Sequence, residues 1–219
     1  MIAKELISNE VSALRTSDTG EETITMMSIF HVKHLPIVND TQFLGLISEE
    51  DVLSNNMEEP IGSYALSLAK PFCKDTDHIF EAMSKMARHK LTVIPVIDQD
   101  ENYLGLITQD DLIQFYAQTF SFAEPGSIVV ISTPRPNYSL AELSRIIEAE
   151  NAQILSTMLS EEEGTNNVLV TLKLNRNEIQ NILASLERFD YEIKASFAEI
   201  EYVDGLKDRY DLLMNYLNV

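Results

Sequence analysis

A stretch of about 60 residues occurs twice in the first half of this chain. The segment Leu35–Val38 returns as Ile94–Ile97 after 59 residues, and Gly45–Leu53 returns as Gly105–Ile113 after 60. The one-residue difference falls in the loop between the two segments, where an insertion costs little loop-closure entropy. A repeat of this length corresponds to one supersecondary unit. The first half of the chain therefore folds as two copies of the same unit.

Each copy has the pattern of a helix, two strands and a second helix. In the second copy, Ile79–Ala87 has apolar residues at helical spacing, and Asp75–Asp77 supplies candidates for the N-cap of that helix. The first copy repeats the spacing over Ile24–Phe30. Two short apolar strands joined by a polar turn follow, which is the pattern of a hairpin.

Ser48 and Thr108 stand where the second strand of each copy gives way to its second helix. Each is followed three residues later by an aspartate, Asp51 and Asp111. A hydroxyl with an acid three residues further on predicts a helix capping box. These residues therefore begin two helices at equivalent points of the repeat.

The pattern changes after about Ala117, and Ser121–Gly126 is typical of a linker. The residues beyond it follow the order βαββαβ, which predicts a split βαβ sheet with both helices on one face. Ser139 and Glu142 predict a capping box at the first of these helices. The predicted segments are strands at 127–133, 154–159, 168–174 and 191–197, and helices at 140–147 and 179–186.

The last residues, 203–219, predict an amphipathic helix. Five apolar residues recur there at helical spacing, namely Leu206, Tyr210, Leu213, Met214 and Leu217. Such a stripe needs an apolar surface to cover it, and self-association of the chain would provide one.

The charge of the chain narrows the choice of partners. Sixteen basic residues against 35 acidic ones give a net charge of −19, which repels phosphate backbones and anionic lipids. We therefore expect no nucleic acid and no membrane as a partner. A single cysteine, Cys73, cannot form an internal disulfide, and the sequence has neither a signal-peptide pattern nor a membrane-spanning run. These features predict a cytoplasmic protein.

No pattern of a catalytic or metal site is present in the sequence. There is no G-x-G-x-x-G, P-loop or nucleophile-elbow motif, and the four histidines and one cysteine lack the spacing of a zinc site. The acidic runs Glu49–Asp51 and Asp110–Asp111 are interpreted as helix starts, and Glu161–Glu163 as a solvated turn. We expect no catalytic residue, no metal and no required cofactor. An enzyme of an unrecognised type is the alternative.

The two copies resemble a tandem pair of cystathionine-β-synthase (CBS) domains. The resemblance rests on the proline strands Leu35–Val38 and Ile94–Ile97 and on the Gly-hydrophobic-hydrophobic-Ser/Thr-x-x-Asp motifs that begin at Gly45 and Gly105. The region after the linker resembles an ACT domain through its strand-to-helix loop, Thr133–Leu143. These resemblances imply an α+β chain with CBS repeats at 1–58 and 59–120, a βαββαβ ferredoxin-like ACT domain at 127–200 and a terminal helix at 203–219.

Two CBS repeats followed by one ACT domain, at this length, are similar to the acetoin-utilisation accessory protein family. That resemblance implies a non-catalytic regulatory protein. Its expected ligand is an adenine nucleotide, AMP, ADP or ATP, held in the cleft between the CBS repeats. Its expected partners are a second copy of the chain, in a homodimer, and an enzyme of a catabolic pathway.

In CBS pairs the motif aspartate binds the ribose hydroxyls, and the motif hydroxyl contacts the phosphate. Carried over to this chain, the resemblance assigns ribose binding to Asp51 and Asp111 and phosphate contact to Ser48 and Thr108. A carboxylate can accept hydrogen bonds from two vicinal hydroxyls, which suits a ribose. The same residues also suit helix capping with no ligand, so this alternative stays open.

Basic residues ahead of the first proline strand make the two sites unequal. Lys33 and His34 precede that strand, whereas the second copy has Thr92 and Val93 at the matching positions. A phosphate favours the basic side, so Lys33 and His34 are predicted phosphate contacts. Compensation of the C-terminal end of the preceding helix would also explain these cations.

The ACT-like part leaves two interpretations. Members that bind amino acids commonly have a glycine in the loop after the first strand, where this chain has Asn137. Asparagine tolerates left-handed geometry, but its side chain occupies space that a ligand would use. This favours an assembly module. A constitutive dimerisation scaffold without a ligand and amino-acid sensing are therefore the alternatives to nucleotide sensing.

Overall fold

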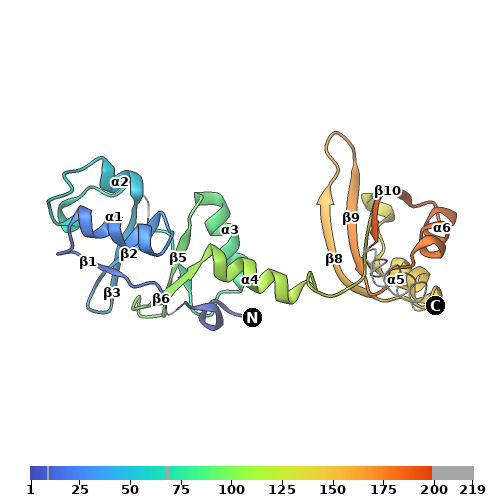
Figure 1. Ribbon diagram of the computed structural model, residues 1–219, viewed down its shortest axis with the longest axis horizontal. Coiled ribbons are helices and arrows are strands. Elements are labelled where there is room, and N and C mark those ends of the chain that lie inside the picture. The colour runs from blue at the N-terminus through green and yellow to red at the C-terminus, as the bar shows by residue number, and fades with distance from the viewer. Residues whose placement is uncertain (9, 68–69, 199–219) are drawn as a thin grey trace, which may run out of the picture. The chain divides into compact units, whose positions relative to one another are not determined.

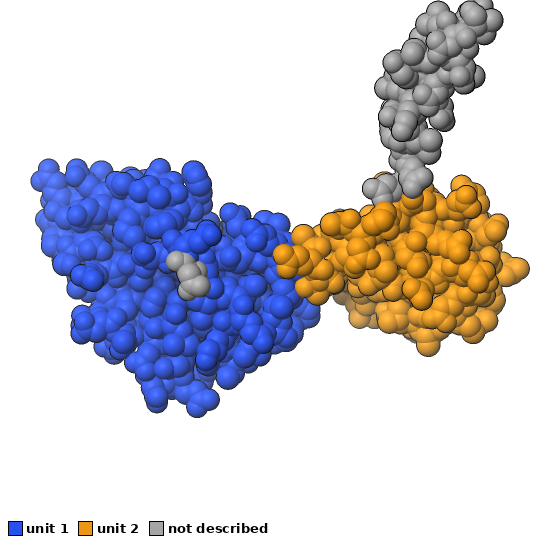
Figure 2. Space-filling model, turned by 60° about the horizontal axis from the view of Figure 1, so that its bottom comes forward, with its two compact units in different colours: residues 1–116 blue, residues 117–219 orange. Residues whose placement is uncertain are grey.

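The computed structural model describes residues 1–8, 10–67 and 70–198. The chain divides into two compact units, residues 1–116 and residues 117–219 (Figure 2), which have separate hydrophobic cores. The amphipathic helix predicted at 203–219 lies outside the described residues.

The first unit contains the two sequence repeats, and each folds into helix, strand, strand and helix as predicted (Figure 1). Each copy also begins with a two-residue strand that was not predicted, and this strand pairs in parallel with the proline strand. The first copy consists of β1 (Leu14–Arg15), α1 (Gly20–Ile29), β2 (His34–Asn39), β3 (Gln42–Ser48) and α2 (Glu49–Leu53). The second consists of β4 (Cys73–Lys74), α3 (Ile79–His89), β5 (Val93–Ile97), β6 (Tyr103–Thr108) and α4 (Gln109–Thr119), and 3-10 turns lie at Ala3–Leu6 and Ile61–Ser63.

The hairpins of the two copies match strand for strand. β2 pairs antiparallel with β3, and β5 pairs antiparallel with β6. Both ladders shift register at the same place, after Ile37 in one copy and after Val96 in the other. A register shift of this kind bends the strand locally. The sequence repeat is therefore also a repeat of backbone geometry.

The segment that enters each repeat crosses the second strand of the other repeat. A Cβ added at Gly45 would lie 2.8 Å from the Leu66 Cδ1, and one added at Gly105 would collide with the Ile7 Cγ2. Gly105 also has a φ of +151°, which side chains rarely adopt. Gly105 is therefore favoured both by the close approach of Ile7 and by its φ, whereas at Gly45 the close contact is with the end of the flexible Leu66 side chain, which can move aside.

Both repeats contribute to one hydrophobic core. Leu35 and Ile47 from the first copy and Ile94 and Ile107 from the second are all fully buried in it. Strands β2 and β5 lie next to each other. Gln42, the first residue of β3, forms an isolated antiparallel bridge with its counterpart Asn102, which directly precedes β6. The two repeats therefore fold as one body, and their relative placement is fixed by packing.

The N-cap predicted within Asp75–Asp77 is wrong, because α3 begins later. His78 is the N-cap residue, and its Nδ1 accepts a hydrogen bond from the Phe80 N–H at 3.3 Å. Asp77 Oδ2 instead accepts a hydrogen bond from the Lys74 N–H at 3.0 Å. The acid is used to close the turn between β4 and α3, so the next residue caps the helix.

The second unit has the predicted βαββαβ order and an antiparallel sheet. Its strand order is β10-β7-β9-β8, and α5 and α6 pack on one face of the sheet (Figure 1). The alternation predicted for β9 appears directly, because every second residue of that strand is buried. The elements are β7 (Ser127–Pro134), α5 (Leu140–Ala149), β8 (Ile154–Glu161), β9 (Asn167–Leu174), α6 (Gln180–Arg188) and β10 (Glu192–Ala198).

The capping box predicted for α5 forms only in part. Ser139 Oγ accepts a hydrogen bond from the Glu142 N–H at 3.3 Å, as expected. The Glu142 carboxylate does not return to the Ser139 backbone and accepts instead from the Tyr191 hydroxyl at 3.1 Å. Tyr191 is 5% exposed, so its hydroxyl needs a partner inside the fold. The Glu142 carboxylate therefore bonds to a residue distant in the chain and does not complete the local capping box.

The solvated turn predicted at Glu161–Glu163 is wrong for its middle residue. Glu162 contacts Lys194 Nζ at 2.9 Å and accepts a hydrogen bond from the Ser132 hydroxyl at 2.8 Å. Its side chain is 17% exposed. The bonds from Lys194 and Ser132 lower the pKa of Glu162 to about 2. Glu162 therefore ties the β8–β9 hairpin to β7 and β10.

We predict that Glu162→Gln lowers the stability of the second unit at neutral pH. A carboxyl group whose pKa is lowered by folding stabilises the fold above its unfolded pKa, near 4.5, and this contribution is lost as the pH falls toward 2. The difference in unfolding free energy between wild type and variant should therefore shrink over that interval. Denaturant unfolding at a series of pH values measures it.

The exposed neighbour Glu163 provides a matched control. Glu163→Gln removes the same charge from the same hairpin and should leave the pH dependence unchanged. Equal effects of the two substitutions would show that the bonds of Glu162 contribute nothing.

Candidate functional site

A cleft of about 310 Å³ opens beside the start of α2 and is built from both repeats. The first repeat contributes the end of β3 and the residues that open β2, and the second contributes the C-terminal end of α3. We call it the first cleft. Its lining residues are Lys33, His34, Ser48, Glu49, Glu50, Ser67, His89 and Lys90.

A second cleft, of about 540 Å³, lies at the equivalent place beside the start of α4. Here the second repeat contributes the end of β6 and the first turn of α4, and the first repeat contributes the end of α1 and the entering segment. Both volumes lie in the range of small-molecule sites. The lining residues are Ser8, Glu10, Val11, Ile29, Phe30, His31, Thr108, Asp110, Asp111 and Gln114.

The two clefts are related by the repeat. His31 and Lys90 are equivalent residues 59 positions apart, both follow the first helix of their copy, and both have a left-handed φ of 53°. Five of the six predicted site residues line a cleft, with Lys33, His34 and Ser48 in the first and Thr108 and Asp111 in the second. Their role in binding stays a prediction.

Asp51 lies behind the first cleft, and its carboxylate accepts three hydrogen bonds from the fold. Oδ2 accepts from the Ser48 N–H at 2.9 Å and from the Ser48 hydroxyl at 2.7 Å, and Oδ1 accepts from the Ser67 N–H at 3.1 Å. The residue is only 6% exposed. Burial alone would raise the pKa of Asp51, but the bonds from Ser48 and Ser67 outweigh it and lower that pKa.

Asp111 has the same capping bonds but a free oxygen. Its Oδ2 accepts from the Thr108 N–H at 2.8 Å and from the Thr108 hydroxyl at 2.6 Å. Among the described residues, no hydrogen bond reaches its Oδ1. Asp111 is also partly exposed to the second cleft. It can therefore accept a hydrogen bond from a hydroxyl group of a ligand without breaking a bond of the fold.

His34 joins the two repeats at the first cleft. The Thr92 N–H donates to His34 Nδ1 at 3.2 Å, and the Thr92 hydroxyl lies 3.0 Å from the same nitrogen. The hydrogen-bond pattern assigns the ring proton to Nε2, because Nδ1 accepts from a backbone N–H. Burial lowers the pKa of His34, although Asp51 and Glu50 oppose this effect. The neutral ring therefore keeps Nε2–H as a donor.

Five lining residues of the first cleft were not predicted as site residues, and two of them, Glu49 and Glu50, directly follow Ser48 in the chain. Lys90 and His89 come from the second repeat, and Ser67 comes from the segment between the repeats. No sequence motif places them beside Ser48. The signal that could have found Lys90 is its equivalence to His31 through the repeat, combined with the docking of the two copies.

The clefts differ in charge. The first has two lysines, Lys33 and Lys90, opposite Glu49 and Glu50. Lys33 Nζ lies 3.7 Å from Glu49, and both side chains are well exposed, so this pair holds the lysine only weakly. The described lining of the second cleft has the carboxylates of Glu10, Asp110 and Asp111 and no lysine or arginine.

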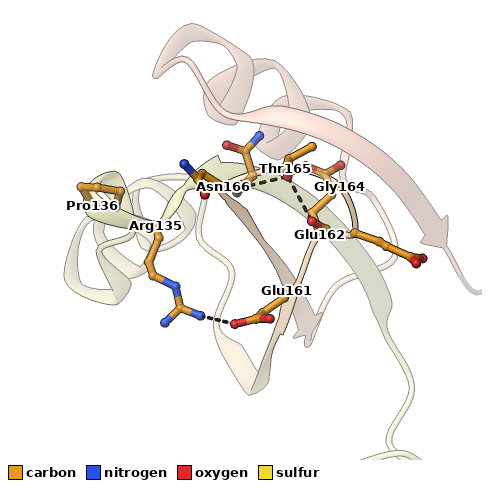
Figure 3. A pocket seen from close by; sticks show the side chains of 9 residues that line it. Arg135, Pro136, Glu161, Glu162, Gly164, Thr165 and Asn166 are labelled. Atoms are coloured by element: carbon orange, nitrogen blue, oxygen red, sulfur yellow. Dashed lines mark hydrogen bonds and ion pairs between the residues drawn. The ribbon is translucent and has the colours of Figure 1, made fainter.

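The second unit has two further cavities. One, of about 580 Å³, lies under the β8–β9 hairpin, where Arg135 and Glu161 point toward each other at 3.0 Å (Figure 3). Another, of about 360 Å³, lies at the predicted ACT loop and includes Asn137. Asn137 belongs to a 3-10 turn, Arg135–Asn137, and does not use the left-handed conformation that asparagine permits.

Other chemistry is limited in the described part of the chain. Cys73 is fully buried, and burial raises the pKa of its thiol to about 11, so it is a poor nucleophile. In residues 1–8, 10–67 and 70–198, no three His, Cys, Asp or Glu side chains gather as metal ligands. No helix in these ranges is long and apolar enough to cross a membrane.

Residues 3–58 and 68–118 match the family model of the CBS domain. The first unit is a tandem CBS domain pair. Two repeats, two equivalent clefts and the match to both halves agree on this assignment. The second unit, with its four-stranded antiparallel sheet and two helices, is consistent with an ACT-like domain.

The CBS pair is similar to parts of larger and distant proteins. Homoserine O-acetyltransferase of Methanohalobium evestigatum is 24% identical over 115 residues, which cover 49% of this chain and 22% of that protein. The chain thus spans less than a quarter of that relative, and the enzyme's activity does not carry over.

Two solved structures are also similar. A CBS domain pair/ACT domain protein from Thermotoga maritima has 19% identity and a TM-score of 0.49, over 54% of this chain and 98% of that one. A protein from Vibrio cholerae assigned to acetoin utilization has 20% identity and a TM-score of 0.48, over 57% and 96%.

The unequal bonding of the two aspartates leads to a prediction on stability. Asp51→Ala leaves the buried Ser48 N–H and the Ser67 N–H without their acceptor, and should cost about 3 kcal/mol of unfolding free energy. Asp111→Ala removes a cap at a partly exposed place and should cost about 1 kcal/mol. Urea unfolding of the two variants measures the difference. Equal costs would mean that the Ser67 contact contributes nothing.

Proposed function

We propose that this protein is a non-catalytic regulatory protein whose CBS pair binds an adenine nucleotide between its repeats. The observation that carries the proposal is the first cleft. It is built from both repeats and has Lys33, Lys90 and the Nε2–H of His34 beside the hydroxyl of Ser48. On a chain with a net charge of −19, such a cluster of cations and donors is a local exception that suits a phosphate.

The proposed roles follow from the geometry of each residue. Lys33 and Lys90 attract the phosphate by charge, and the Nε2–H of His34 supplies a shorter-range hydrogen bond. The Ser48 hydroxyl can donate to the phosphate only when its bond to Asp51 Oδ2 is released. Asp51 is only 6% exposed and the Ser67 N–H lies against its Oδ1, so a ribose hydroxyl reaches this carboxylate when Ser67 moves aside. Binding in the first cleft is then coupled to the segment between the repeats.

The second cleft is proposed as a weaker site for the same ligand. Thr108 and Asp111 repeat the capping geometry, and Asp111 Oδ1 is available to a ribose hydroxyl. The described residues that line the second cleft include no lysine or arginine, and their carboxylates repel a phosphate. We therefore expect AMP, ADP or ATP to occupy the first cleft before the second.

A ligand in the first cleft contacts both repeats at once. It can therefore favour one arrangement of the pair over another, which is the requirement for regulation. We propose that this change is read by a second copy of the chain in a homodimer and by a partner enzyme, as the resemblance to the acetoin-utilisation accessory proteins implies.

One observation favours a ligand-free scaffold as a second candidate. The capping boxes of Ser48 with Asp51 and Thr108 with Asp111 are already complete without any ligand. In that case the CBS pair is a rigid assembly module. Amino-acid sensing has less support, because the Asn137 side chain lines the cavity at the ACT loop.

Titration calorimetry with AMP on the full chain tests the proposal. Lys33→Ala/Lys90→Ala should weaken AMP binding about tenfold or more, because it removes two charge-assisted contacts. Neither lysine is buried, so the fold should be retained. When free AMP is present at 100 times its dissociation constant, the unfolding free energy of the wild type should rise by about 2.7 kcal/mol.

The charge-matched control is Lys4→Ala/Lys74→Ala. Both are exposed lysines of the same unit that line neither cleft. AMP affinity should stay within about twofold of wild type, because salt screens the charges of exposed lysines that lie outside the first cleft. An equal loss in both double variants would mean that overall charge matters and the first cleft does not. Absence of any stabilisation by AMP, ADP and ATP would support the scaffold.

A further inference from the structure

A cavity of about 570 Å³ lies outside both clefts, at the end of β2, whereas the first cleft lies at its start. It is bounded by β1 and the turn after it, by the tip of the β2–β3 hairpin and by one side chain of the second repeat, Tyr103. We call it the slot. Its lining residues are Ala13–Ser17, Val38–Asp40 and Tyr103.

The equivalent place in the other repeat is filled by a ring. The short parallel ladders match, because Leu14 pairs with Ile37 in one copy and Cys73 with Val96 in the other. Phe72, which precedes β4, is therefore the counterpart of Ala13. Its ring meets the Phe43 ring edge to face, with centroids 6.4 Å apart and planes at 73°.

The slot exists because only one ring of the equivalent pair is present there. Phe43 and Tyr103 are counterparts, since they pair with Val38 and Ile97 at the matching points of the two hairpins. Tyr103 thus keeps an aromatic ring on one wall. Ala13 has only a methyl group where Phe72 places its ring, so the other half of the aromatic pair is missing.

The polar groups of the slot indicate the class of compound that fits it. Arg15 and Asp40 contribute one positive and one negative charge, so the lining favours neither sign. The Tyr103 hydroxyl has no hydrogen-bond partner in the described part of the chain, and burial raises the pKa of this phenol, so it stays a donor. Ser17 and Asn39 add further donors and acceptors.

We propose that the slot binds an uncharged, planar aromatic or heteroaromatic compound. Its ring would lie against Tyr103, in the position that the Phe72 ring takes against Phe43, and its polar group would bond to the Tyr103 hydroxyl. Edge-to-face or offset contact between two rings is favourable beyond the area that it buries. The site is separate from the nucleotide clefts and does not depend on the function proposed for them.

Benzamide titrated into the ¹⁵N-labelled full chain tests the proposal by NMR. Saturable amide shifts are expected at Leu14–Ser17 and Asn39–Asp40. Cyclohexanecarboxamide carries the same amide on a non-planar ring and should bind about fivefold more weakly. Ala13→Phe supplies the missing ring from within the chain and should abolish the shifts. It should leave AMP affinity in the first cleft unchanged, so failure of the slot is distinguishable from failure of the nucleotide proposal.

Three results would overturn the proposal. Benzamide could produce no saturable shifts, it could bind no better than cyclohexanecarboxamide, or its binding could survive in Ala13→Phe. If Ala13→Phe does not fold, Ala13→Leu fills part of the same space and should weaken benzamide, and unchanged affinity in that variant counts against the slot equally.

Discussion

The crossing of the two repeats is the constraint on which the CBS pair depends. Each entering segment passes over the second strand of the other repeat, so closely that the strand has a glycine at that point, Gly45 or Gly105. A Cβ at Gly105 would displace the Ile7 side chain of the crossing segment, and one at Gly45 would push aside the end of the Leu66 side chain. Because the crossing and the shared core fix how the copies dock, they also fix which residues meet in each cleft.

The aspartates of the two motifs show how one sequence pattern acquires two physical states. Asp51 and Asp111 occupy equivalent positions and both complete a capping box. Only Asp51 has its second oxygen bonded, by the Ser67 N–H, and only Asp51 is buried. The same difference runs through the clefts, since one is lined by lysines as well as carboxylates and the other, as far as it is described, by carboxylates. The repeat therefore provides two equivalent sites that differ in their chemistry.

Departures from exact repetition are the informative places in this molecule. Lys33 and Thr92 are equivalent positions, and their difference places the Thr92 hydroxyl 3.0 Å from His34 Nδ1 across the interface of the repeats. Ala13 and Phe72 are another such pair, and their difference leaves a cavity in one copy where the other has packed rings. Elsewhere the hairpins keep the same ladders and bulges, and His31 and Lys90 share a left-handed φ of 53°. Function in such a fold is expected where the symmetry is broken.

The sequence by itself determined the number of repeats, the type and order of the longer helices and strands and the positions of Ser48 and Thr108 at helix starts, but not the two-residue strands β1 and β4. The features that it determined depend on spacing and capping, which act over a few residues and are visible in one stretch of chain. It did not determine the N-cap at His78, the use of Glu142 by Tyr191 or the burial of Glu162. Nor did it place Lys90 and Ser67 beside Ser48. Tertiary structure decided these, because each depends on residues distant in the chain or on competition between local turns, and only the packed fold sets which partner a polar group meets.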